Sequence, residues 1–183
     1  MSLRPEGYRK GARLLHWGMA LLVLLMIAAG LLMVQKGLPR PLQDALFLMH
    51  KHIGLLILVL VALRILFRWM NPPPPLPMTM PDWQRRIARA SHLLLYVLLV
   101  AMPVLGFIRV RAGGFPIELL DALGLGGPVP RSESLAETAK ALHRAGAFLL
   151  IGLLCLHVGA ATHHALIRRD GVWQRMWPPF GGN

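Results

Sequence analysis

The sequence predicts an all-α integral membrane protein, built as a bundle of four transmembrane helices. Two observations predict this class. Hydrophobic residues make up 55% of the 183 residues and the mean hydropathy is +0.53, which is too apolar for an ordinary soluble domain. The chain also contains four apolar segments that approach or exceed the roughly 20 residues that an α-helix needs to cross a bilayer. We expect residues 1–183 to form a single domain.

The four apolar segments follow one another along the chain at residues 14–34, 45–67, 92–108 and 145–167. The first segment carries one histidine and no formal charge, and no small-residue cleavage site follows it. We therefore interpret it as an uncleaved membrane helix rather than a signal peptide. The third segment is short, and the last two take further residues from their flanks. With these flanks, the predicted helices cover about residues 8–34, 41–69, 84–110 and 134–168.

The connections between the segments carry linker and turn signals. Four consecutive prolines, residues 72–75, predict a stiff extended spacer between the second and third helices. The longest connection, residues 109–140, contains "IELLDALGL", which predicts a short surface helix. Ser134 is followed three residues later by Glu137, which is the pattern of a capping box. We therefore expect the fourth helix to begin near Ser134.

The net charge of +12 is explained by membrane topology, and it does not require a nucleic-acid partner. If the N-terminus is cytoplasmic, the inner segments contain 12 cations and 3 acids, whereas the outer segments contain 8 cations and 5 acids. Lysine and arginine accumulate on the cytoplasmic side of membrane proteins. We therefore expect both termini in the cytoplasm, with membrane lipid around the bundle.

Eight histidines are the most informative polar residues of this chain, and at least five of them fall within the predicted helices. They are His16, His50, His52, His92, His143, His157, His163 and His164. An ionisable residue within a membrane span is costly and usually faces the bundle interior. For any single histidine, a neutral ring hydrogen-bonded to another helix is the simplest explanation. The spacing within the set favours ligation of metal ions instead.

His143 and His157 lie 14 residues apart on the fourth predicted helix. They are therefore about 21 Å apart along the axis and within about 40° of one face. This geometry suits two separate sites stacked through the membrane, and it does not suit one metal site. His16 lies near the inner end of the first helix and His50 near the outer end of the second. Two pairs follow, His16 with His157 and His50 with His143.

Two such histidine pairs are what two b-type haems would need. A neutral imidazole is a good axial ligand for haem iron, and facing helices can hold the macrocycle between them. An iron with six ligands has no open position for a substrate, which favours electron transfer over oxygen chemistry. A haem-free proton or metal transporter that uses the same histidines is the alternative from a different class.

The apolar segments resemble the four helices of bacterial cytochrome b561, and the match covers nearly the whole chain. The matching stretches are "LLHWGMALLVLLMIAAG", "HKHIGLLILVLVALRILFR", "SHLLLYVLLVAMPVLGF" and "LHRAGAFLLIGLLCLHVGAATHHAL". The resemblance implies four haem ligands, which are His16, His50, His143 and His157. His52 departs from the family pattern. It points about 200° away from His50 around the helix, so we do not expect it to share the same haem.

The resemblance also implies a location in the bacterial inner membrane, two haem b cofactors and ubiquinone as an electron partner. The implied function is electron transfer between the periplasmic side and the quinone pool. In one form the protein is an oxidoreductase that takes electrons from superoxide. In the alternative form it is a cytochrome b subunit that passes electrons between a periplasmic dehydrogenase and quinone.

Further residues near the ligands are candidates for contacts to quinone or to haem propionates. The candidates for hydrogen bonding or proton donation to quinone are His92, His163 and His164. The candidates for neutralising haem propionates are Arg13, Lys51 and Arg144. The ordinary alternative for these residues is a location at the membrane interface, where charged ends reach the lipid headgroups.

Overall fold

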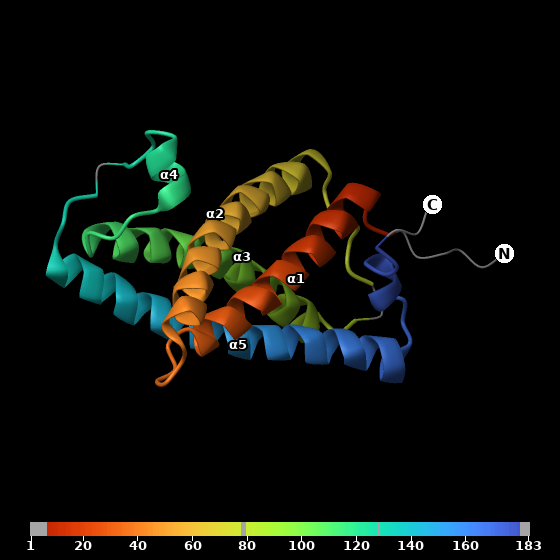
Figure 1. Ribbon diagram of the computed structural model, residues 1–183. Coiled ribbons are helices and arrows are strands. Elements are labelled where there is room, and N and C mark those ends of the chain that lie inside the picture. The colour runs from red at the N-terminus through yellow and green to blue at the C-terminus, as the bar shows by residue number, and fades with distance from the viewer. Residues whose placement is uncertain (1–6, 78–79, 128, 180–183) are drawn as a thin grey trace.

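Four long helices dominate the computed structural model, which describes residues 7–77, 80–127 and 129–179 (Figure 1). The long helices are α1 (Lys10–Leu32), α2 (Arg40–Met70), α3 (Asp82–Ala112) and α5 (Glu133–His163). The short helix α4 (Glu118–Ala122) lies between α3 and α5, and the π-helical turn η1 (His164–Arg168) and the 3-10 turn η2 (Trp173–Arg175) follow α5. The described residues form no strand, and the predicted all-α class is confirmed.

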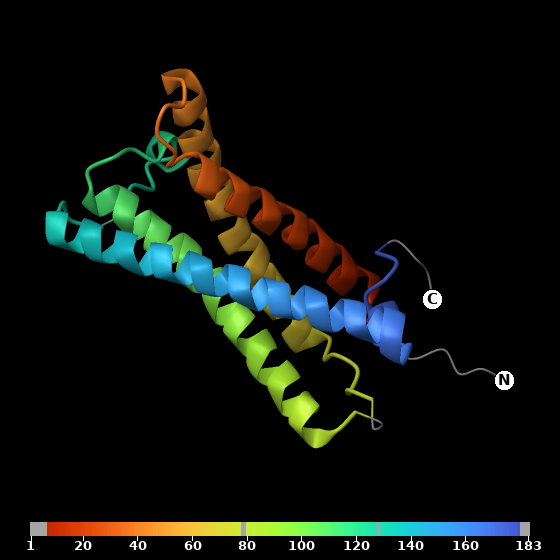
Figure 2. The ribbon, with the colours of Figure 1, turned by 90° about the horizontal axis from the view of Figure 1, so that it is seen from below.

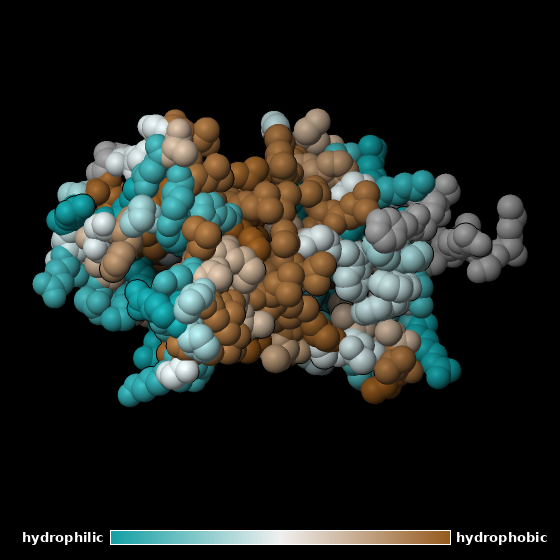
Figure 3. Space-filling view, viewed as in Figure 1, coloured by the Kyte–Doolittle hydropathy of each residue, from teal (hydrophilic) through white to brown (hydrophobic). Residues whose placement is uncertain are grey.

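Each long helix is long and apolar enough to cross a membrane. The candidate spans are Lys10–Leu32, Arg40–Met70, Asp82–Ala112 and Glu133–Arg168. Large aliphatic side chains such as Leu21, Val59 and Leu93 are more than half exposed. A hydrophobic belt covers the middle of the molecule and hydrophilic residues gather at its two ends (Figure 3). Such a surface suits lipid acyl chains, and the four predicted transmembrane helices are confirmed.

Helix α5 begins near Ser134, as the sequence predicts, but a different serine caps it. The helix begins at Glu133, and Ser132 is its N-cap. The Ser132 hydroxyl accepts a hydrogen bond from the backbone N–H of Leu135 at 3.3 Å, which is the usual bond of a capping serine. The expected capping box at Ser134 is therefore wrong. The Glu137 carboxylate accepts hydrogen bonds from Lys140 instead.

The two ends of the described chain meet at one end of the bundle, which we call the terminal end (Figures 1 and 2). The backbone N–H of Tyr8 donates to the carbonyl of Arg175 at 3.0 Å. The Trp17 indole N–H donates to the carbonyl of Met176 at 2.9 Å. The Arg175 guanidinium also donates to the carbonyl of Pro75, in the α2–α3 connection. The C-terminal segment thus closes this end of the bundle.

The α1–α2 and α3–α5 connections lie at the opposite end, which we call the loop end (Figure 1). In both ribbon views α5 runs the length of the bundle between the two ends (Figures 1 and 2). The predicted cytoplasmic location of both termini agrees with their shared position at the terminal end, but the direction in which this end faces stays a prediction.

A small apolar core holds the four long helices together between the two ends. Helix α3 packs along α5 and against α2, and α1 packs against α2. The buried core side chains are Val23, Ile57, Leu95, Leu98 and Leu150, so each long helix contributes. Leu150 lies seven residues from both His143 and His157 on α5. The core therefore separates the positions of these two histidines.

Candidate functional site

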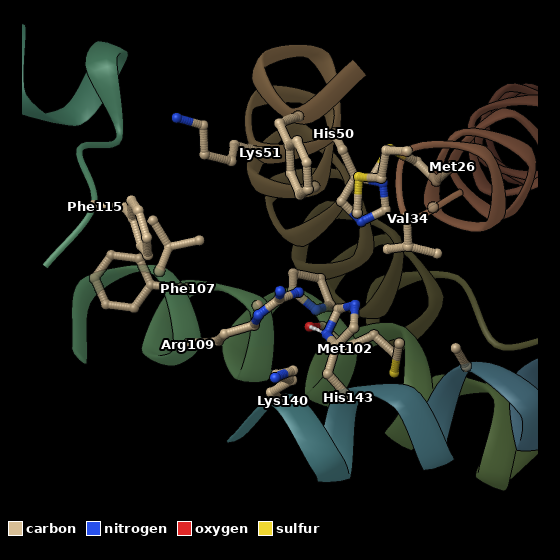
Figure 4. Close-up of a pocket in the computed structure, with 18 of the residues that line it drawn as sticks. Met26, Val34, His50, Lys51, Met102, Phe107, Arg109, Phe115, Lys140 and His143 are labelled. Atoms are coloured by element: carbon tan, nitrogen blue, oxygen red, sulfur yellow. Dashed lines mark hydrogen bonds between the residues drawn. The ribbon is translucent and has the colours of Figure 1, made fainter. Parts of the chain in front are cut away.

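At the loop end, a histidine of α2 faces a histidine of α5 across the bundle (Figure 4). The ring centroids of His50 and His143 lie 6.3 Å apart, and both residues are partly buried. Two opposed imidazoles that share a metal ion, with metal–nitrogen bonds of about 2 Å, place their ring centroids about 6 Å apart. The spacing of this loop-end pair is therefore suited to one shared metal ion.

At the terminal end, a histidine of α1 faces the second histidine of α5. The ring centroids of His16 and His157 lie 6.1 Å apart, which is also the spacing that a shared metal ion needs. This is the terminal-end pair. A third ring, that of His92 on α3, lies 5.5 Å from the ring of His157. The structure thus brings together both pairs that the sequence spacing indicates, and adds His92 beside one of them.

The hydrogen bonds of the loop-end pair leave ring nitrogens for a ligand. The Nδ1 of His143 lies 3.0 Å from the carbonyl oxygen of Met102, so Nδ1–H donates and Nε2 keeps its lone pair. A second hydrogen bond of this kind is what orients histidines that bind metals. The Nδ1 of His50 is buried and has no hydrogen-bond partner among the described residues. Buried polar atoms are rarely left unsatisfied, which favours an added ligand here.

Two glycines allow the neighbouring backbones to approach the loop-end rings. A Cβ atom placed on Gly30 of α1 would lie 3.1 Å from Cε1 of His50, and one placed on Gly106 of α3 would lie 3.4 Å from Cε1 of His143. The first of these distances is too short for an ordinary contact. The two glycines therefore leave the histidine rings the space to face each other.

A large cavity adjoins the loop-end pair. It has a volume of about 1690 Å³, and its lining includes both histidines and apolar side chains such as those of Met26, Leu99 and Phe107 (Figure 4). Ligand pockets usually measure about 300–1,000 Å³ and have mainly apolar walls. A cavity of this size with two facing imidazoles fits a flat apolar macrocycle such as haem. The loop-end site therefore fits haem b by spacing, donor atoms and room.

Basic side chains outnumber acidic ones in the lining of this cavity. The six basic residues are Arg40, Lys51, Arg109, Arg131, Lys140 and Arg144, and the four acidic residues are Asp44, Glu118, Glu133 and Glu137. Of the three predicted propionate contacts, Lys51 and Arg144 therefore lie at the loop-end site. The third, Arg13, is only 5% exposed and lies one turn before His16 on α1, toward the terminal end.

Lys51 and His52 attach α4 to α2 at the edge of the cavity. The Lys51 ammonium donates to the Glu118 carboxylate at 2.6 Å and to the Pro116 carbonyl at 2.9 Å. This hydrogen bond from Lys51 lowers the pKa of Glu118 below its ordinary value. The Nε2 of His52 accepts a hydrogen bond from the backbone N–H of Leu119 at 3.3 Å. His52 thus contacts the loop and not the haem-ligand candidates, a role that sequence reasoning missed.

A second ion pair, between α3 and α4, supports the same connection. The Arg111 guanidinium donates to the Asp121 carboxylate, and this hydrogen bond lowers the pKa of Asp121. Both acidic residues of α4 therefore form ion pairs, Glu118 with Lys51 and Asp121 with Arg111.

The three predicted quinone contacts lie in different surroundings. His92 lies inside the bundle beside His157. His163 and His164 lie at the end of α5, with ring centroids 6.0 Å apart, and the Nδ1 of His164 lies 2.6 Å from the Asp170 carboxylate. Their predicted role in binding quinone stays a prediction.

Arg64 is a further polar residue at the terminal-end pair, and sequence reasoning counted it only among the inner cations. Its guanidinium contacts His16 on α1 and Tyr96 on α3. The signal that could have identified it is a charge inside an apolar segment, since such residues usually face the bundle interior.

A four-helix membrane bundle with two histidine pairs at metal-sharing distance has the architecture of a membrane cytochrome b. The chain matches the prokaryotic cytochrome b561 family over residues 7–179, and it belongs to this family. Membership implies haem b binding and a role in membrane electron transfer, in a multi-pass protein of the bacterial inner membrane.

Three relatives are similar over nearly their whole length. The chain is 34% identical to cytochrome b561 homolog 2 of Escherichia coli K12, an alignment that covers 94% of this chain and 92% of the relative. It is 30% identical to the probable superoxide oxidase CybB of Yersinia pestis, over 92% of this chain and 94% of the relative. Cytochrome b561 homolog 1 of E. coli K12 is 28% identical, over 90% and 93%.

We expect Gly30→Val to displace the His50 ring, because the added side chain would overlap it, and to lower the bound haem by about half. Gly18→Val is the matched control on α1, since nothing lies within 4 Å of a Cβ atom at that position. Haem and protein are quantified together in the purified samples. Equal haem content in the two variants would show that the contact between Gly30 and His50 does not shape the site.

Proposed function

We propose that this protein is a transmembrane electron carrier with two haem b groups, one bound by the loop-end pair and one by the terminal-end pair. The observation that supports this most strongly is the pair of ring-centroid distances, 6.3 Å and 6.1 Å. When bound, haem supplies one-electron oxidation and reduction. The four histidines hold the groups at two depths, about 21 Å apart along α5.

Ligation by two histidines favours electron transfer over substrate chemistry at the metal. His50 and His143, or His16 and His157, would each hold one haem iron between two imidazoles, which would leave no place on the metal for oxygen or another substrate. The protein's contribution is then to fix the two rings, to exclude water with an apolar surround and to set the charge nearby. Electrons would cross the apolar core between the pairs, with quinone as the partner on one side.

Superoxide is the small-molecule electron donor that we propose at the loop end. The cavity there is lined by six basic and four acidic side chains. Neither Arg109 nor Arg144 forms an ion pair with a carboxylate among the described residues, so the charges of these two arginines are not cancelled there. Such a field attracts a small anion and raises its rate of capture. Two superoxide anions would each give up one electron and leave as O₂, and ubiquinone would take both electrons with two protons.

One observation favours a second candidate, in which the protein is a membrane subunit for a periplasmic dehydrogenase. Beside the basic residues, the loop end exposes a group of large apolar side chains, half or more accessible, which are Phe115, Leu119, Leu123 and Leu125. Aromatic and aliphatic side chains next to charges are typical of surfaces that bind proteins. Quinone reduction by the isolated protein with superoxide as the sole donor would exclude this candidate.

We expect His50→Ala and His157→Ala each to lose one haem, and a different one, because each removes a ligand from one pair. His52→Ala, the matched control two residues from His50, should keep both. Anaerobic visible spectra with haem quantification provide the measurement. Wild-type protein that stays colourless despite haem supply would favour a haem-free transporter, and retention of both haems in His50→Ala and His157→Ala would contradict the ligand assignment.

We expect Glu118→Gln to speed superoxide-driven ubiquinone reduction by about twofold at low ionic strength, because it removes a negative charge from the cavity edge and frees Lys51. Asp82→Asn makes the same change of charge at the start of α3, at the other end of the bundle, and should leave the rate unchanged. The gain should shrink as salt is added. An equal rate for Glu118→Gln and wild type at low salt would argue against electrostatic capture at the loop end.

A further inference from the structure

A guanidinium lies within the membrane-spanning part of α2, next to the terminal-end pair. Arg64 is only partly exposed, and it is six residues from the helix end at Met70. A cation inside a membrane span is costly, so such residues usually face the bundle interior and serve the functional site. The charge of Arg64 contributes to the excess of inner cations, but neither that excess nor the ligand set accounts for its place inside the bundle.

Arg64 joins three helices. Its Nε donates to the Tyr96 hydroxyl of α3 at 3.0 Å, and its Nη1 donates to the Ala12 carbonyl of α1 at 3.4 Å. Its Nη2 lies 3.3 Å from Nδ1 of His16, one turn after Ala12. The Cζ atom also lies 5.8 Å from the centre of the Tyr96 ring. These contacts fix the guanidinium at the edge of the His16 ring, which is one of the proposed haem ligands.

The charge of Arg64 is not neutralised by a carboxylate among the described residues. The ion pairs found there involve other cations, and the partners of Arg64 are a hydroxyl, a carbonyl and an imidazole. A charge in an apolar surround that is not cancelled acts strongly over short distances. A guanidinium can only donate, so Nδ1 of His16 is the acceptor in this contact and its lone pair is not available to a metal while the contact lasts. The effect of Arg64 on a metal bound by His16 is therefore that of a nearby charge.

The two histidine pairs therefore differ in the groups that contact their rings. At the loop end the ring of His143 donates to a neutral carbonyl, that of Met102. At the terminal end the ring of His16 meets a cation. A hydrogen bond to a carbonyl makes a ligating imidazole more electron-rich, which stabilises the ferric state. A nearby cation stabilises the ferrous state, which carries one positive charge less.

We propose that Arg64 raises the reduction potential of the haem bound at the terminal-end site, because it keeps an uncancelled positive charge beside His16. This inference rests on the proposed binding of haem by His16 and His157. It assigns to Arg64 a role in setting the direction of electron flow between the two pairs, because an electron moves toward the group with the higher potential.

The test is a redox titration of the haem-loaded, full-length protein by visible spectroscopy. His157→Ala identifies the transition of the terminal-end haem. In Arg64→Gln we expect the reduced-to-oxidised ratio of this haem at a fixed potential to fall at least tenfold, which is 59 mV for a one-electron couple. The loop-end transition should not move. Arg64→Lys, which keeps the charge, should retain most of the wild-type potential.

Arg68→Gln is the matched control. Arg68 lies one turn further along α2, and its Cζ is also 5.8 Å from the centre of the Tyr96 ring, so the substitution removes the same charge from the same helix. We expect a change of less than threefold in the same ratio. Equal shifts in Arg64→Gln and Arg68→Gln, or no shift in Arg64→Gln, would overturn the inference.

Tyr96→Phe decides the question if Arg64→Gln does not assemble with both haems. It keeps the guanidinium charge and removes the hydroxyl that fixes its place, so we expect the reduction potential of the terminal-end haem alone to change. An unchanged potential would overturn the role of Arg64. Wild-type protein with fewer than two haems would contradict the proposed function, whereas two haems without these effects would contradict only the role of Arg64.

Discussion

An imidazole inside a membrane bundle has to find its partners on the other helices, because lipid acyl chains offer no hydrogen bonds and no charge. In this protein that constraint determines how the helices face one another. Helix α5 carries His143 and His157 on nearly one face, and each ring meets a histidine from a different helix. Two further features keep the rings of each pair facing each other. They are the glycines beside the loop-end rings and the apolar core between the two pairs.

The apolar core and the two histidine pairs are alternating layers of one bundle. Val23, Ile57 and Leu150 lie between the pairs, so in the proposed carrier an electron that moved from one pair to the other would cross aliphatic side chains. A layer of this kind blocks the passage of ions and protons while it leaves electron tunnelling open. In the proposed carrier the bundle would thus let electrons pass and stop protons.

The four long helices were predictable from the sequence because hydropathy can be read from one segment at a time. Many contacts of the site were not, because they depend on how each helix is rotated about its axis and how closely it approaches its neighbours. The 14-residue spacing of His143 and His157 was enough to indicate two depths and two partners. It could not reveal that His143 would meet the Met102 carbonyl, or that His52 would contact the α4 backbone. The cap of α5 was misplaced by two residues, because serines at 132 and 134 both precede the helix and only backbone geometry distinguishes them.

The two ends of the bundle differ in access as well as in charge. The loop-end pair adjoins a large cavity with a basic lining. At the terminal end, Trp17 stacks edge-on against Trp173 and Trp177 at 6.0 Å and 5.3 Å, and the C-terminal segment covers the start of α1. A carrier with equal ends would move electrons either way with equal ease. In the proposed carrier a small anion would approach one pair through the cavity, whereas the other pair lies beside Trp17 and the Arg64 guanidinium. These differences between the ends would give the bundle a basis for directional electron transfer.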